Sequence, residues 1–179
     1  MKTSPVDPLP HLVSVARASG EPGQPEALFA ALDRAMSAVI GHKLFTLLVY
    51  HAAASQSERR YSNRPKAYPV GGRKPVTPSA WTERLFRERR PYIGRTADDI
   101  RAVFFDHELI LSLGCESVLN VPVVWNERTL GTINLLHEAG WYDERDIPVA
   151  VAFAALAVPG YLELLRRAAP ASPSERERP

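Results

Sequence analysis

The side chains best suited to metal or redox chemistry lie between residues 98 and 115 of this chain. They are Asp98, Asp99, Asp106, His107 and Cys115. Carboxylate, imidazole and thiolate groups are ligands for iron or zinc, but their spacing here matches no metal-binding template. Asp98 and Asp106 also suit the N-caps of short helices. We therefore expect no metal ion and no cofactor, and keep as an alternative a small redox-type enzyme that uses Cys115 or an Asp/His metal site.

Cys115 is the one cysteine of the sequence, which excludes an intrachain disulfide. A reactive thiolate needs a cationic neighbour or a helix N-terminus, whereas Cys115 follows Gly114, a residue type that commonly ends a helix. This position predicts a small buried thiol rather than a nucleophile. The sequence also lacks the spacing of a Ser-His-Asp triad or a phosphate-binding loop. We therefore predict a protein without catalytic activity.

A second group of residues suits the binding of a planar organic ligand. Trp81, Tyr92 and Phe104 have rings that stack on planar molecules, and packing in the core is the alternative role for them. Arg95 and Thr96 would contact an anionic group of that ligand, or else act as a solvated cation and a helix cap. The predicted ligand-binding set is Trp81, Tyr92, Arg95, Thr96, Asp98, Asp99, Phe104, His107, Asn120 and Asn134.

The segment 117–137 predicts the centre of a sheet. Two apolar runs flank the short polar break 125–128, a pattern typical of a hairpin. Both faces of both runs are largely apolar, so the hairpin should be covered on both sides. Asn120 and Asn134 interrupt the apolar pattern. An unpaired buried amide costs about 1–3 kcal/mol, so each is predicted to be a structural anchor or a ligand contact.

The turn of this hairpin leaves two registers open. A tight two-residue turn at Asn126-Glu127 would place Glu127 at a positive φ, and a wider turn avoids this. The two turns differ by one residue in register. A shift of one residue exchanges the faces of a strand, so the sequence does not decide which of Asn120 and Asn134 faces a pocket.

The remaining elements follow from periodicity and from helix-capping residues. Helices are expected over 25–40, 79–89, 106–113 and 143–169, with a helical turn over 99–104. Strands are expected over 43–52, 59–63 and 91–94, and residues 64–78 form a long irregular loop of the kind that is often functional. This order predicts an α/β (α+β) sandwich with a mixed, mostly antiparallel sheet.

Three stretches of the sequence resemble a known family. SVLNVPVVWNERTLGTINLLH, the following WYDE helix start and the upstream PYIGRTADDI are similar to GAF domains over residues 26–165. Asn126-Glu127 departs from the Asp-Gly that the family often has. The resemblance implies a central sheet with the terminal helices on one face and a pocket roofed by short helices and loops on the other. It also implies a small-molecule sensor that signals through a separate partner.

Composition bears on partners and location. The formal net charge of +2 is too small to indicate binding to nucleic acid. No uninterrupted apolar run approaches the ~20 residues of a membrane span, and the N-terminus lacks the apolar core of a signal peptide. We therefore expect a cytoplasmic protein that binds neither a membrane nor nucleic acid.

Pro and Gly positions divide the chain. Residues 1–24 are predicted to be a flexible N-terminal arm, 25–169 the GAF-like domain and 170–179 a disordered tail. The last helix is more apolar than one sheet face can cover, which favours a homodimer through the terminal helices. The sequence thus predicts a sensory domain that binds a small organic ligand, with a pure dimerisation module as a further alternative.

Overall fold

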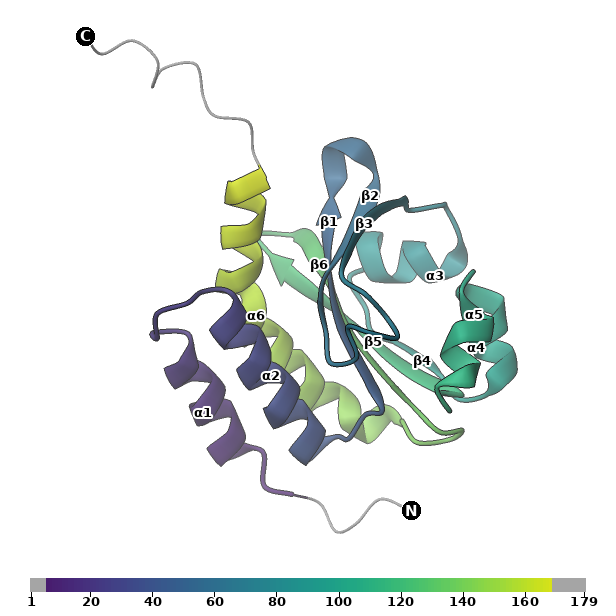
Figure 1. The fold of residues 1–179 in the computed structure, drawn as a ribbon, viewed down its shortest axis with the longest axis horizontal. Helices are drawn as coiled ribbons and strands as arrows, with labels where there is room; N and C mark the ends of the chain where they lie inside the picture. The colour runs from purple at the N-terminus through teal and green to yellow at the C-terminus, as the bar shows by residue number, and fades with distance from the viewer. Residues whose placement is uncertain (1–5, 169–179) are drawn as a thin grey trace, which may run out of the picture.

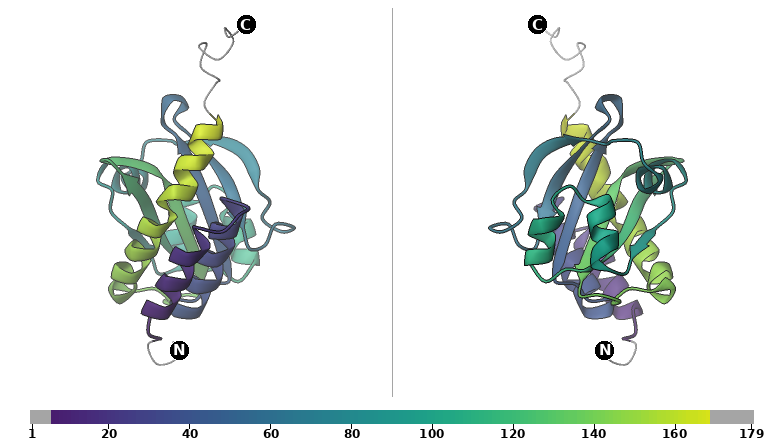
Figure 2. Two further views of the ribbon diagram at one scale, coloured as in Figure 1. Left: turned by 90° about the vertical axis from the view of Figure 1, so that its left-hand side faces the viewer. Right: turned by 90° about the vertical axis from the view of Figure 1, so that its right-hand side faces the viewer.

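The computed structural model describes residues 6–168 and contains a six-stranded sheet with helices on both faces (Figures 1 and 2). The order of the strands in the sheet is β3-β2-β1-β6-β5-β4. The strands are β1 (Leu44–His51), β2 (Gln56–Ser62), β3 (Gly71–Pro75), β4 (Tyr92–Gly94), β5 (Ser117–Trp125) and β6 (Arg128–His137). Every described pairing is antiparallel, so the sheet is antiparallel rather than mixed.

Two helices lie on one face of the sheet, α2 (Glu26–Val39) and α6 (Ile147–Ala168), and α1 (Leu9–Ala18) packs on these two helices (Figure 1). Short helices lie on the other face: α3 (Ala80–Thr82), continued by the π-helical turn η2 (Glu83–Arg87), α4 (Ala97–Val103) and α5 (His107–Ser112). Two 3₁₀ turns, η1 (Ala52–Ala54) and η3 (Glu144–Asp146), complete the described elements. This arrangement confirms the expected α+β sandwich.

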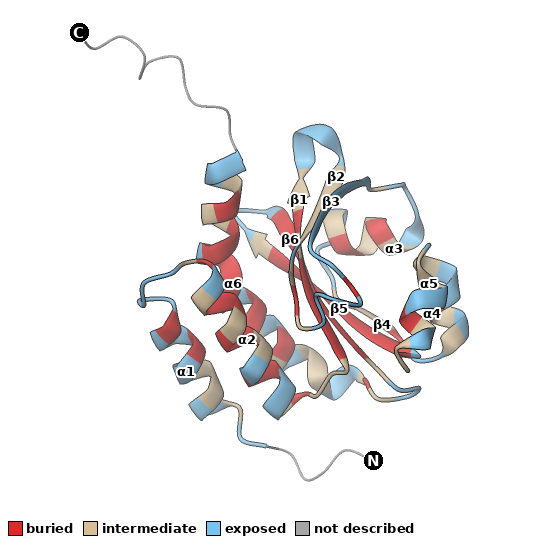
Figure 3. Ribbon diagram, in the orientation of Figure 1, coloured by how far each residue is buried: buried red, intermediate tan, exposed pale blue. Residues whose placement is uncertain are grey.

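Alternation along the central strands separates two apolar clusters. Leu119, Val121 and Val123 of β5 point toward the long helices and join the larger cluster. Val118, on the opposite face of the same strand, belongs to a smaller cluster with residues of α4 and α5. Buried residues therefore line both faces of the central strands (Figure 3). The hairpin is covered on both sides, as its composition indicated.

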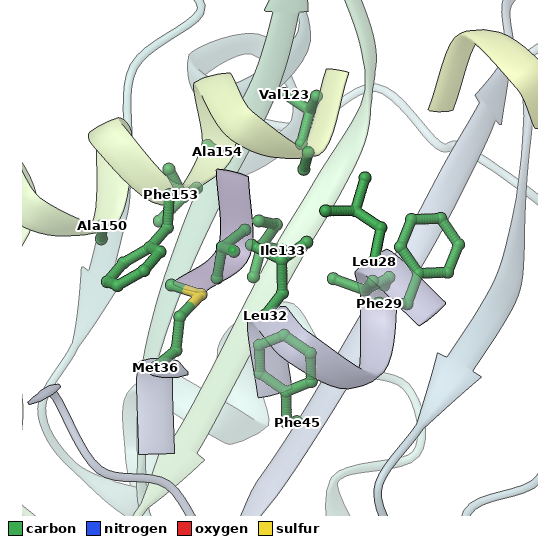
Figure 4. Packing of buried hydrophobic residues seen from close by; sticks show 14 of the residues in the cluster. Leu28, Phe29, Leu32, Met36, Phe45, Val123, Ile133, Ala150, Phe153 and Ala154 are labelled. Atoms are coloured by element: carbon green, nitrogen blue, oxygen red, sulfur yellow. The ribbon is translucent and has the colours of Figure 1, made fainter. Parts of the chain in front are cut away.

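The larger cluster holds the long helices on the sheet. Leu32 and Met36 of α2 pack beside Phe153 of α6 and Ile133 of β6 (Figure 4). Gly131 of β6 allows close approach on two sides, because a Cβ there would lie 2.0 Å from the backbone oxygen of Leu48 in β1 and 2.6 Å from the Tyr161 ring of α6. This packing holds α2 and α6 on the sheet face opposite the short helices.

One helix, Glu144–Ala168, is long and apolar enough to cross a membrane by length and composition, with a mean hydropathy of 1.8. Its residues Ala150, Phe153, Ala157 and Tyr161 are fully buried against the sheet and α2. Core packing therefore accounts for the apolar residues on the inner side of this helix, whereas Val151 is 45 % exposed.

The N-terminal segment differs from the flexible arm predicted for residues 1–24. Residues 9–18 form α1, and Val15 is fully buried in the larger cluster. Pro8 stands at the N-terminal end of this helix, where proline is tolerated. The Pro-rich composition concealed a short apolar stripe, so this prediction is wrong for α1. The predicted tail, 170–179, lies outside the described residues.

The hairpin adopts the tight turn. Asn126 and Glu127 have φ values of 47° and 59°, and Trp125 pairs with Arg128. The register then shifts by one residue between Val123 and Val124, so that Val123 pairs with Gly131. This bulge sets Asn120 directly opposite Asn134. Residues opposite each other on neighbouring strands share a face, and the two amides therefore lie on the same side of the sheet.

Candidate functional site

A cavity of about 470 Å³ lies between the sheet and the short helices. This volume falls within the ~300–1,000 Å³ typical of small-molecule sites. The floor comes from β1, β2 and β6, and the walls come from β3, α3, η2 and the segment between α4 and α5. Most of the lining is apolar or aromatic, and its members include Leu48, Tyr50, Val76, Ala80, Trp81, Phe86, Val103, Phe104, Phe105, Ile110, Thr132 and Leu136.

A chain of hydrogen bonds crosses the floor. Trp81 Nε1 donates to Asn120 Oδ1 at 3.0 Å, and Asn120 Nδ2 donates to Asn134 Oδ1 at 2.7 Å. Asn134 Nδ2 then donates to Thr46 Oγ1 at 3.2 Å. Asn120, Asn134 and Thr46 are 0 %, 6 % and 2 % exposed, so their polar groups must be satisfied within the protein. The chain joins three adjacent strands and anchors Trp81 over them.

Local structure positions the two aromatic rings that flank this floor. Ser79 caps α3 by accepting from the backbone N–H of Thr82, and the Thr82 side chain accepts in return from the Ser79 backbone. Trp81 follows within that first turn. Its ring meets the Phe104 ring edge to face, with centroids 5.5 Å apart. Phe104 stands at the C-terminal end of α4, so the two covering helices meet above the cavity.

A charged cluster, which we define as Arg59, Tyr68, Lys74 and Asp106, forms one wall. Tyr68 Oη donates to Asp106 Oδ2 at 2.6 Å. Arg59 Nη2 and Lys74 Nζ lie 3.9 and 4.0 Å from the same oxygen. The Arg59 guanidinium carbon sits 3.7 Å from the Tyr68 ring centroid, and Lys74 Nζ lies 3.8 Å from that of Phe105. These are cation–π distances.

The charged cluster is only partly satisfied. Arg59 Nη1 donates to the Pro69 backbone oxygen at 2.7 Å, but within residues 6–168 the buried Arg59 Nε has no hydrogen-bond partner. Burial lowers the pKa of Lys74, and Asp106 partly opposes that shift. Burial, with the hydrogen bond to Asp106, raises the pKa of Tyr68, so this phenol stays protonated at neutral pH. The cavity wall therefore carries two cations and one carboxylate.

Solved structures of other proteins have this architecture. A scan of protein-family models gives no match, and no curated protein matches the sequence. The GAF domain of a phosphoenolpyruvate-protein phosphotransferase from Coxiella burnetii superposes with a TM-score of 0.71 at 11% identity, covering 93% of this chain and 99% of that one. The chain has the GAF-domain fold.

Two further structures show the range of proteins with a similar fold. The phycocyanobilin-bound GAF domain of a cyanobacterial phytochrome has a TM-score of 0.67 at 14% identity, over 90% of this chain and 97% of that one. The free methionine-R-sulfoxide reductase of Neisseria meningitidis, solved with its substrate, has a TM-score of 0.66 at 15% identity, over 94% and 98%. The likeness thus includes one bilin-bound domain and one enzyme.

The GAF fold brings four of the predicted ligand-binding residues together. Trp81, Phe104 and Asn134 line the cavity, and Asn120 supports Trp81 and Asn134 from below. Tyr92 lies on β4 directly opposite Asn120, but it is not part of the lining. Asn120 and Asn134 were open alternatives in the sequence, and the register places both on the cavity side.

The other five predicted residues lie outside the cavity lining. Thr96 and Asp99 form a capping box at the start of α4, which confirms the predicted cap. Arg95 pairs with the Glu144 carboxylate at 2.5 Å, and Asp98 pairs with Arg101 at 2.7 Å, both at the surface. His107 Nδ1 lies 2.9 Å from the Phe104 backbone oxygen. These contacts are made with other groups of the protein outside the cavity, and a ligand-binding role for the five residues stays a prediction.

The residues of the alternative metal site do not come together. Within residues 6–168, no group of three or more His, Cys, Asp and Glu side chains is arranged to hold a metal ion. The Cys115 thiol is buried in the smaller cluster, and this burial raises its pKa to about 11. Asp106 occupies the N-cap position of α5, but its side chain makes no capping bond and accepts from Tyr68 instead.

Most of the charged cluster lies outside the residues predicted from the sequence. Tyr68 and Lys74 lie in the segment expected to be an irregular loop, which contains β3. Arg59 was assigned only to a strand, although that strand begins earlier, at Gln56. The available signal was the length of the loop itself, since long loops are often functional. Residue types alone did not connect Arg59, Lys74 and Asp106, because they meet only through the sheet topology.

Proposed function

We propose that this chain is a regulatory GAF-fold domain that binds a small organic molecule in the 470 Å³ cavity. The observation that carries the proposal is the pairing of a largely apolar, aromatic cavity with a floor that holds the hydrogen-bond chain from Trp81 to Thr46. Cavities of this kind bind ligands through apolar contact and use a few fixed polar groups for orientation. Trp81 and Phe104 would contact a planar body, and Asn134 and Thr46 would orient it.

Signalling would proceed by a population shift. Phe104 and Asp106 belong both to the cavity wall and to the junction between α4 and α5. A ligand that contacts these residues in one arrangement of the junction stabilises that arrangement by its differential affinity. Amide hydrogen exchange in residues 97–112 should then slow when the cavity is occupied.

The test of cavity binding uses the neutral fluorescent probe N-phenyl-1-naphthylamine. Saturable binding to the full chain, with one site per chain, is the expected result. Thr132→Phe places a ring on the cavity floor and should weaken this binding at least about tenfold, which is ~1.4 kcal/mol. Ser57→Phe, on β2 and also in the cavity lining, is a second filling variant in case the first is poorly folded.

The matched control is Ala53→Phe, which adds the same ring in the exposed turn η1 and should leave binding unchanged. Absence of saturable binding, or equal binding by the filled and control variants, would refute the proposal. Native mass spectrometry of the purified chain gives an independent measurement, because a retained small molecule appears as a defined mass addition.

A homodimer through the terminal helices and a separate output protein belong to the same proposal. Leu9 and Val13 of α1 and Val151 of α6 are 63 %, 41 % and 45 % exposed, on the helical layer that faces away from the cavity. Exposed apolar side chains of this kind support association when they are contiguous. Sedimentation of the full chain at two concentrations tests the dimer, and a monomer at both would contradict it. The cytoplasmic location stays a prediction from the sequence.

A further inference from the structure

The charge of the cavity wall bears on the class of ligand. Arg59 and Lys74 contribute two positive charges, and Asp106 contributes one negative charge. Tyr68 is neutral at pH 7, as an ordinary phenol is, and burial raises its pKa further. The wall therefore carries a net charge of +1 inside a cavity whose remaining lining is uncharged and mostly apolar. A desolvated net charge is stabilised when an opposite charge binds beside it.

Asp106 does not neutralise the two cations at close range. Its contacts to Arg59 Nη2 and Lys74 Nζ, at 3.9 and 4.0 Å, lie at the outer limit of an ion pair, whereas its short bond of 2.6 Å goes to Tyr68. The buried Arg59 Nε has no hydrogen-bond partner in the described part of the chain. An unpaired donor on a charged group costs free energy that an acceptor from a ligand would recover.

The position of the cluster is suited to a ligand with one charged end. Lys74 lies on the exposed strand β3 and has 48 % of its side chain exposed, whereas Arg59 has 13 %. The cations thus extend from the surface into the cavity. The Trp81 and Phe104 rings and Ile110 provide apolar surface for the rest of the molecule.

We infer that the ligand is a small organic carboxylate with an aromatic or branched aliphatic body, and that its carboxylate binds between Arg59 and Lys74. The inference rests on the proposed function, since it requires the cavity to bind a ligand. A single carboxylate matches the net charge of +1 and offers acceptors to both cations. Arginine and lysine make charge-assisted hydrogen bonds to such groups.

The experiment compares two competitors of nearly the same shape, of which one carries a negative charge and the other is neutral. Naphthalene-2-carboxylate and naphthalene-2-carboxamide each displace N-phenyl-1-naphthylamine from the full chain at low salt. Half-displacement by the carboxylate should need at least about tenfold less competitor than by the amide. This preference should shrink as salt is raised, because the cluster is partly open to solvent.

Three variants assign the preference to the cluster. Lys74→Met should reduce it, whereas Lys66→Met, the same substitution at an exposed site outside the lining, should leave it unchanged. Asp106→Asn removes the competing negative charge, keeps an acceptor for Tyr68 and should increase the preference. Arg59→Gln should reduce it further than Lys74→Met does. Affinity for the neutral probe in every variant checks that the cavity is intact.

The outcomes separate the two proposals. Failure of the neutral probe to bind would refute the proposed function. Binding of that probe with equal displacement by carboxylate and carboxamide would refute only the carboxylate inference. Opposite shifts for Lys74→Met and Asp106→Asn support the inference, and shifts in the same direction overturn it. Naphthyl phosphate provides the last comparison, because tighter binding of this dianion than of the carboxylate would overturn the assignment of a monoanion.

Discussion

The hydrogen-bond chain on the cavity floor predicts strong energetic coupling between Asn120 and Asn134. The perturbation is replacement of each by leucine, which has the same number of side-chain heavy atoms, singly and together. Asn120→Leu leaves Trp81 Nε1 without its acceptor and Asn134 Oδ1 without its donor. Asn134→Leu leaves Asn120 Nδ2 and Thr46 Oγ1 without partners. Each single variant therefore leaves two polar groups without a hydrogen-bond partner.

The expected loss in free energy of unfolding follows from the number of these unpaired groups. A buried polar group without a partner costs about 1–3 kcal/mol, and we take ~1 kcal/mol because water can enter the adjoining cavity. Each single variant should then lower the free energy of unfolding by about 2 kcal/mol. The double variant leaves only Trp81 Nε1 and Thr46 Oγ1 without partners. It should therefore also lower the free energy of unfolding by about 2 kcal/mol, and not by about 4 kcal/mol. The coupling energy is about 2 kcal/mol, within the range seen for neighbouring groups.

The assay is urea unfolding followed by far-UV circular dichroism and tryptophan fluorescence. The slope of the free energy with urea must stay constant across the four proteins for the cycle to be valid. Costs of the single variants that add to within ~0.5 kcal/mol in the double variant would refute the reasoning. That result would mean that the two amides do not share a hydrogen bond in solution.

Three further predictions concern other parts of the fold. Gly131→Ala should lower the free energy of unfolding in urea by more than about 3 kcal/mol, because its Cβ would meet the Leu48 backbone oxygen and Tyr161. The control Gly20→Ala, where a Cβ makes ordinary contacts, should be nearly neutral. Equal effects of the two substitutions would contradict the packing of α6. The Cys115 thiol of the folded protein should react with Ellman's reagent at least ~100-fold more slowly than that of the unfolded chain, since its pKa is raised from 9.0 to about 11. A fast reaction would favour the alternative of a redox-type enzyme that uses Cys115. Backbone N–H groups of Arg95 and Thr96 hold the pKa of Asp99 below its ordinary value of 3.8. The ionised carboxylate therefore stabilises the fold above pH 3.8, and this contribution is lost as the pH falls through the lower pKa of the folded state. The thermal stability lost in Asp99→Asn should therefore be visible at pH 7 and shrink below pH 4, and a constant difference would exclude the capping role.

Periodicity and capping residues were sufficient for most of the fold. The helix over 25–40 and the hairpin over 117–137 carry strong local signals, and each is present. β3 carries none, since the residues GGRKP are glycine-rich and exposed and are ordered by pairing with β2. α1 was hidden by neighbouring prolines. Elements that depend on tertiary contacts rather than on local pattern were those that the sequence did not predict.

The residues of the candidate site also fall into those that a local sequence pattern predicts and those that depend on tertiary contacts. Trp81, Phe104 and the two asparagines were predicted because an aromatic ring or a buried amide stands out within its own segment. Arg59 and Lys74 do not stand out, because a cation on a strand is ordinarily a solvated side chain. Their relevance comes from facing Asp106, 47 and 32 positions away in the numbering, across a cavity that only the sheet topology creates. Charge complementarity between distant segments is therefore the part of the site that sequence patterns conceal.

The bulge opposite Val123 and Val124 determines which polar groups reach the cavity. Trp125 pairs with Arg128 and Val124 with Thr129, and continuing that register would set Ile133 opposite Asn120. Asn134 would then point into the apolar layer beneath α2 and α6, where no amide partner lies among the cluster residues. The single extra residue, Leu130, moves Asn134 to the cavity face and closes the chain from Trp81 to Thr46. A bulge is thus the local device that converts an apolar hairpin into the floor of a binding site.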